Sequence, residues 1–152
     1  MESGSTCSYG QYFEQSRSLI LMKNKVLNII RILFGVILIA FGANKFFGFM
    51  PMPELSGQAG DFMGALGMTG YIFPVVGAVE LGVGVLLVLN LFTPLALVVL
   101  VPISVNIVLF HVFLDIGGIV PAAVVAGLNA LFLVLNLSAY LPMLSTGSKS
   151  GD

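Results

Sequence analysis

Charged side chains are scarce in this sequence. Its 152 residues include 6 Lys and Arg and 7 Asp and Glu, so 9% are charged and the formal net charge is -1. A soluble domain carries roughly a quarter charged residues, which allows it to cover its surface in water. A protein that binds nucleic acid neutralises phosphates with many Lys and Arg side chains. The composition therefore argues against an ordinary soluble domain and against a nucleic-acid partner.

Residues that carry redox centres and metals are equally rare. The chain has one cysteine, Cys7, and one histidine, His111. A disulfide within the chain, a CxxC motif or a thiolate cluster needs at least two cysteines, and a bis-histidine haem site needs two histidines. We therefore expect no metal site and no intrinsic redox cofactor.

Apolar residues make up 58% of the chain, and they gather in long runs. The hydrocarbon core of a bilayer is about 30 Å thick, and a helix of about 20 apolar residues crosses it. Such helices satisfy their own backbone groups, and the runs lack the alternation of a barrel strand. The sequence predicts an all-α fold, a bundle of four transmembrane helices within residues 26–144. The predicted spans are Val26–Phe47, Tyr71–Phe92, Pro94–Leu114 and Ile119–Leu141.

The flanking segments are polar. Residues 1–25 are predicted to form a flexible tail that runs into a basic juxtamembrane segment, and residues 145–152 a disordered tail. Basic flanks of membrane helices stay in the cytoplasm. The first span follows Arg17, Lys23 and Lys25, and an even number of crossings returns the chain to its starting side. Both termini are therefore expected to be cytoplasmic.

One long connection, residues 48–70, separates the first two spans. It contains apolar residues at helical spacing, and several glycines that weaken a helix. We expect a short interfacial element here rather than another crossing. The apolar positions are Leu55, Ala59, Phe62, Met63 and Leu66.

Several polar residues fall inside the predicted spans. A charge at mid-membrane costs about 2.5 to 3.5 kcal/mol even on lenient insertion scales, so it should face protein and find a partner. Glu80 lies between Gly77 and Gly84 on one helical face. Its predicted partner is Arg31, Lys45, Asn106 or Asn129.

The polar residues have two possible roles, and the pattern leaves both open. They could lock the four helices together, or they could line a pocket that binds a substrate. We make no prediction of a catalytic residue. The predicted members of this substrate-binding site or polar core are Arg31, Lys45, Glu80, Asn106, His111 and Asn129.

Three stretches resemble the DoxX family of small four-helix membrane proteins. They are RILFGVILIAFGANKF, ALGMTGYIFPVVGAVELGVGVLLVLNLFTPLAL and VPISVNIVLFHVFLD. The family pattern transfers to Arg31, Lys45, Glu80 and His111. The resemblance implies a bacterial-type cytoplasmic (inner) membrane protein and a link with thiosulfate:quinone oxidoreductase subunits. It also implies a link with membrane oxidoreductase complexes that balance thiols and oxidative stress, and more distant relatives look like assembly chaperones.

Two hypotheses for the function follow. In the first, the chain is a redox-associated membrane subunit. It binds a quinone or a small sulfur compound in a pocket bounded by Lys45, Glu80, Asn106 and His111. A redox protein partner would then supply the electrons. In the second, the chain is a non-catalytic scaffold or assembly factor, which binds a partner protein or a second copy of itself in the lipid bilayer.

Overall fold

The computed structural model describes residues 5–50 and 55–144, and every regular element in these ranges is helical. Four helices are long and apolar enough to cross a membrane: Leu21–Phe47 within the first helix, then Ile72–Leu89, Thr93–Phe113 and Ile116–Leu135. These segments overlap the four predicted spans. The all-α fold with four candidate membrane spans is therefore confirmed, and the chain is an integral membrane protein.

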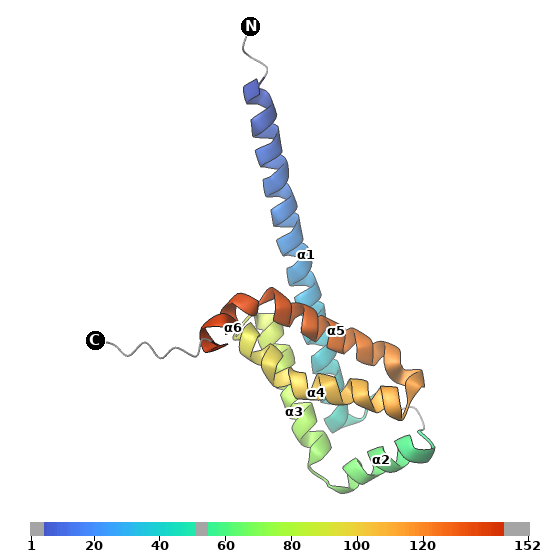
Figure 1. The fold of residues 1–152 in the computed structure, drawn as a ribbon. Helices are drawn as coiled ribbons and strands as arrows, with labels where there is room; N and C mark the ends of the chain where they lie inside the picture. The colour runs from blue at the N-terminus through green and yellow to red at the C-terminus, as the bar shows by residue number, and fades with distance from the viewer. Residues whose placement is uncertain (1–4, 51–54, 145–152) are drawn as a thin grey trace, which may run out of the picture.

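The helices are arranged as two hairpins. Helix α1 (Ser5–Phe47) packs mainly against α3 (Ile72–Leu89), and α4 (Thr93–Phe113) packs mainly against α5 (Ile119–Leu135). A short 3-10 turn, η1 (Ile116–Gly118), joins α4 to α5. Figure 1 shows the amino-terminal half of α1 projecting beyond the other helices, while its carboxyl-terminal half lies within the bundle.

The long connection contains a short helix, α2 (Gly57–Met68). Its 12 residues span about 18 Å at 1.5 Å per residue, which is too short to cross a bilayer. It lies at the end of the bundle opposite the projecting part of α1 (Figure 1). Its Ala59 is buried, and its Phe62 ring lies 5.8 Å from the Phe110 ring of α4. The predicted short element between the first two spans is confirmed as a helix.

Glycines bring α1 and α3 into close contact. A Cβ added at Gly35 would lie 2.7 Å from the backbone oxygen of Gly84, and one added at Gly42 would lie 2.8 Å from that of Gly77. Gly35 and Gly42 lie on one face of α1, and Gly77 and Gly84 lie on the face of α3 that carries Glu80. Small residues let two membrane helices approach closely, and so gain packing energy that lipid cannot supply.

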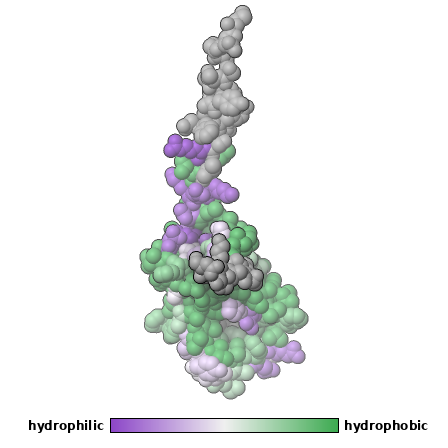
Figure 2. Space-filling view, turned by 60° about the vertical axis from the view of Figure 1, so that its left-hand side comes forward, coloured by the Kyte–Doolittle hydropathy of each residue, from purple (hydrophilic) through white to green (hydrophobic). Residues whose placement is uncertain are grey.

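The side chains of the bundle core come from all four long helices. Phe34 of α1 stacks on Phe132 of α5 with the ring centroids 6.4 Å apart. Around this stack the core contains large apolar side chains that are almost fully buried: Leu38, Leu87, Leu97 and Leu100. Most other apolar side chains face outward, as expected where the solvent is lipid (Figure 2). On the face shown in Figure 2, hydrophilic residues gather on the projecting part of α1.

The structure differs from the predicted boundaries at both ends. Helix α1 begins at Ser5, so the helix extends into the segment predicted as a flexible tail. No proline interrupts the helix between Ser5 and Phe47, and a helix once formed adds residues at little cost. The predicted fourth span is too long, because α5 ends at Leu135 and a separate helix, α6 (Leu137–Leu144), follows.

At the break the backbone changes to the tighter hydrogen bonds between residues three apart. The Asn136 N–H reaches the Leu133 carbonyl oxygen at 3.2 Å, and the Ala139 N–H donates to the Asn136 carbonyl oxygen at 2.9 Å. Helix α6 is then held by Tyr140, whose hydroxyl donates to the Pro94 carbonyl oxygen at 2.8 Å. Burial raises the pKa of Tyr140, so this hydroxyl keeps its proton.

The orientation in the membrane stays a prediction and can be tested by reporter fusions. Reporters placed after residue 10, at Gly57, at Leu91 and after Ser145 should read cytoplasmic, external, cytoplasmic and cytoplasmic. The reason is that four crossings return the chain to the side of its basic flank. An external signal from either terminal fusion would contradict the predicted orientation.

Candidate functional site

An ion pair joins α1 to α3 inside the bundle. The Nζ atom of Lys45 lies 2.6 Å from Oε2 of Glu80. The Glu80 side chain is 3% exposed and that of Lys45 is 23% exposed. The close approach at Gly77 makes this geometry possible, because a Cβ added there would lie 3.1 Å from Cβ of Lys45. Lys45 is one of the four partners predicted for Glu80.

His111 has a partner beyond the end of its own helix. Its Nδ1 lies 3.0 Å from the backbone oxygen of Asp115 and 3.2 Å from Oδ2 of the same residue. The His111 ring occupies the space that a side chain at position 118 would fill. A Cβ added at Gly118 would overlap Cε1 and Nδ1 of His111. The histidine therefore fixes the turn between α4 and α5.

Asn106 faces outward. It is exposed, and its Nδ2 donates to the Pro102 carbonyl oxygen of its own helix at 2.8 Å. Lys45 and Glu80 bind each other, and His111 binds Asp115. Neither of the two cavities described next is lined by any of the four residues of the predicted pocket: Lys45, Glu80, Asn106 and His111.

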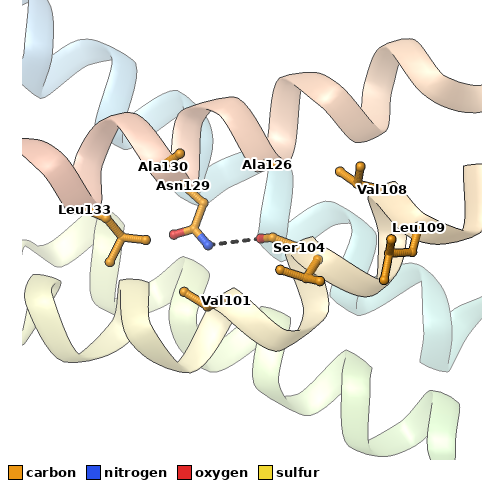
Figure 3. Close-up of a pocket in the computed structure, with 9 residues that line it drawn as sticks. Val101, Ser104, Val108, Leu109, Ala126, Asn129, Ala130 and Leu133 are labelled. Carbon is orange, nitrogen blue, oxygen red and sulfur yellow. Dashed lines mark hydrogen bonds between the residues drawn. The ribbon is translucent and has the colours of Figure 1, made fainter. Parts of the chain in front are cut away.

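A groove between α4 and α5 contains a buried polar pair. Asn129 of α5 is 2% exposed, and its Nδ2 donates to Oγ of Ser104 at 3.0 Å (Figure 3). The other atom of the amide, Oδ1, is buried and has no hydrogen-bond partner. The groove has a volume of about 310 Å³, and its remaining walls are apolar: Val101, Val105, Val108, Leu109, Ala126, Ala130 and Leu133.

The sequence identified one member of this pair and missed the other. Asn129 was predicted, whereas Asn106 was chosen on α4 in place of Ser104. Two residues along a helix correspond to about 200°, so these two side chains point to nearly opposite sides. A hydroxyl in the apolar run of α4 was the available signal. Only the observed rotation of the helix shows that it faces α5.

A second cavity surrounds Arg31 at the end of the bundle where α1 begins its span. Arg31 is 9% exposed, its Nη1 donates to the Leu87 carbonyl oxygen, and its Nε is buried without a partner. The cavity has a volume of about 350 Å³. It is lined by Asn24, Leu27, Asn28, Arg31, Asn90, Thr93, Phe132, Leu135 and Asn136.

Within the part of the chain that the structure describes, no group of three or more His, Cys, Asp and Glu residues could hold a metal ion. In the described ranges, the contact of Lys45 with Glu80 joins two helices, and the contact of His111 with Asp115 lies at a turn. Among the fully buried side-chain nitrogen and oxygen atoms of the described residues, two have no hydrogen-bond partner: Oδ1 of Asn129 and Nε of Arg31.

Comparison with known proteins identifies a family. The DoxX family model matches residues 26–112, which is more than half of the chain and includes most of the first three membrane helices. No match was found among curated proteins or among solved structures.

Proposed function

The chain belongs to the DoxX family, and we propose that it is a redox-associated membrane subunit whose groove between α4 and α5 binds a quinone. The pocket predicted from the sequence used Lys45, Glu80, Asn106 and His111. The proposed pocket differs, because those residues have partners or face outward, whereas the groove contains an unpaired acceptor.

The buried Oδ1 of Asn129 is the observation that carries this proposal. A buried acceptor without a hydrogen bond costs about 1 to 3 kcal/mol, and a ligand that donates a hydrogen bond removes this cost. The hydroxyl of Ser104 accepts from Asn129 and keeps its own hydrogen free. The pair therefore offers one acceptor and one donor side by side.

This combination suits both redox states of a quinone. The hydroxyl of a quinol can donate to Asn129, and the carbonyl of a quinone can accept from Ser104. Conversion of one into the other takes two electrons and two protons. A chain with one cysteine and one histidine has few groups to carry electrons, so a partner redox protein would supply them.

The walls of the groove suit an apolar ring and a lipid-soluble tail. Val101, Val108 and Leu133 are available to pack against the ring. Val105 and Leu109 are exposed on the outer side of α4, so the groove opens where the surrounding lipid lies. A quinone dissolved in the bilayer could enter from the side. A charged sulfur compound fits this apolar groove less well, because its charge would be buried there without a partner of opposite charge.

A non-catalytic scaffold is the second candidate function. The observation that favours it is the ion pair of Lys45 with Glu80 and the contact of His111 with Asp115, which join helices and turns. Such a bundle would offer its apolar outer faces to a partner protein. Removal of Asn129 distinguishes the two functions.

Replacement of Asn129 with leucine is expected to weaken quinone binding about threefold to tenfold, the contribution of one neutral hydrogen bond. Folding should be preserved, because the change also removes an unpaired buried oxygen. The measurement is titration of a short-chain benzoquinone into the purified protein, together with extraction of co-purified quinone and a thermal unfolding curve.

Asn106→Leu is the matched control, since it removes an amide that faces outward from α4. It should leave quinone binding unchanged. Wild-type protein that neither retains nor binds quinone, but is purified with a stoichiometric protein partner, would support the scaffold instead. Equal binding by wild type and Asn129→Leu would also refute the proposed site.

A further inference from the structure

Arg31 carries a charge that no described side chain neutralises. In the described ranges Lys45 contacts Glu80 and His111 contacts Asp115, and neither acidic side chain is paired with this guanidinium. We propose that the cavity around Arg31 is a binding site for an oxyanion, either a free one such as phosphate or the phosphate of an anionic lipid. This inference is independent of the quinone site.

The Arg31 guanidinium is held in place by one hydrogen bond, but its Nε lacks a hydrogen-bond partner. Its Nη1 donates to the Leu87 carbonyl oxygen of α3, which orients the plane of the group. Its Nε is buried and has no partner. A buried charge is costly unless it is paired and hydrogen-bonded. The planar fork of arginine matches two oxygens of a phosphate or carboxylate, so an oxyanion would supply both the charge and the acceptors.

Polar groups from several helices surround the guanidinium. Asn24 and Asn28 come from α1, Asn90 ends α3, Thr93 begins α4, and Asn136 follows α5. Such a lining is unusual beside apolar spans. The Thr93 hydroxyl donates to Oδ1 of Asn90, so the Nδ2 group of Asn90 remains available as a donor.

The position of the cavity favours an anion. Lys23 and Lys25 are exposed on α1 and flank Asn24 of the cavity wall, and their charges attract anions to this part of the surface. The end of α3, the start of α4 and the end of α5 all meet there, so the cavity lies at the end of the spans rather than at mid-membrane. Its volume of about 350 Å³ accommodates a free oxyanion or the head group of a lipid. Basic pockets between membrane helices can hold such head groups.

Two binding measurements on the full chain in a maltoside detergent distinguish the sources. Inorganic phosphate is titrated into delipidated protein, with the thermal unfolding temperature as the readout. Phosphatidylglycerol is added in a second series, with retention of lipid per chain measured by native mass spectrometry. A response to phosphate alone assigns a free oxyanion, and retention of lipid alone assigns a head group. Either result supports the oxyanion site.

Arg31→Gln should weaken binding about tenfold or more, because it removes a charge-assisted fork. Lys25→Gln is the matched control, since it removes the same charge from an exposed position at this end. It should reduce binding far less. Equal losses in the two variants would show general attraction by charge and overturn the proposal. Absence of binding in both wild-type series would also overturn it.

Asn28→Leu provides a test that keeps Arg31, in case Arg31→Gln does not fold. Asn28 is an exposed residue that lines the cavity, and leucine is a better helix former that suits lipid. The larger apolar side chain should narrow the cavity and weaken oxyanion binding at least about threefold, the loss of one hydrogen bond. Unchanged binding by this variant would refute the site.

Discussion

Replacement of Gly84 with alanine is expected to destabilise the bundle by about 1 to 3 kcal/mol, the usual cost of overpacking a well-packed core. The new Cβ would lie 2.7 Å from the backbone oxygen of Gly35 and 2.7 Å from Cγ1 of Ile39. A backbone atom cannot move aside as the end of a side chain can. Helices α1 and α3 would have to separate. Reversible unfolding in mixed detergent micelles measures the change in free energy.

Gly82→Ala is the matched control for this prediction. It lies on the same helix, and a Cβ added there meets nothing within 4 Å. Alanine has a higher helix propensity than glycine by about 1 kcal/mol, so this variant should be neutral or more stable. If both variants changed stability in the same direction and by the same amount, the proposed close packing of α1 against α3 at Gly84 would be refuted.

Replacement of Glu80 with leucine is expected to lower stability by a few kcal/mol, because it leaves the ammonium group of Lys45 without its partner. Breaking a buried ion pair costs about 3 to 5 kcal/mol. We expect the lower part of this range, since Lys45 is 23% exposed and its long side chain can turn toward water. Glu80→Gln should cost less, because its amide oxygen still accepts a hydrogen bond from Lys45.

A double-mutant cycle tests whether the cost comes from the pair. Glu80→Leu combined with Lys45→Met replaces both charges with apolar groups, and it should recover much of the stability lost in Glu80→Leu alone. The free energy of unfolding is measured for wild type, both single variants and the double variant. Additive losses would mean that the two side chains do not stabilise the bundle through their contact.

The packing faces of α1 and α3, though not their contact with each other, could be predicted from residue spacing. Gly35 and Gly42 share a helical face with Lys45, and Gly77 and Gly84 share a face with Glu80. Charged side chains avoid lipid and small residues allow close approach, so both rules place these faces toward protein. The structure places the two faces against each other. The sequence left four partners open for Glu80, because it does not say which helix lies opposite.

The grouping of the remaining polar residues could not be predicted. Asn106, His111 and Lys45 were expected to line one pocket, but each has its own contact. Depth along each helix follows from counting residues, whereas the direction of a side chain depends on the rotation of that helix about its axis. A change of two residues turns the direction by about 200° and moves the depth by only about 3 Å. Ser104 was missed for this reason.

The sequence by itself determined that this protein lies in a membrane as a bundle of four helices. That result depends on the length and apolarity of each span, which are local properties that a bilayer selects without reference to other helices. Only the tertiary structure decided that Asn129 and Arg31 are buried with unused hydrogen-bonding groups. Whether a polar atom finds a partner depends on the rotation and lateral position of every neighbouring helix, and such packing acts between residues far apart in the chain.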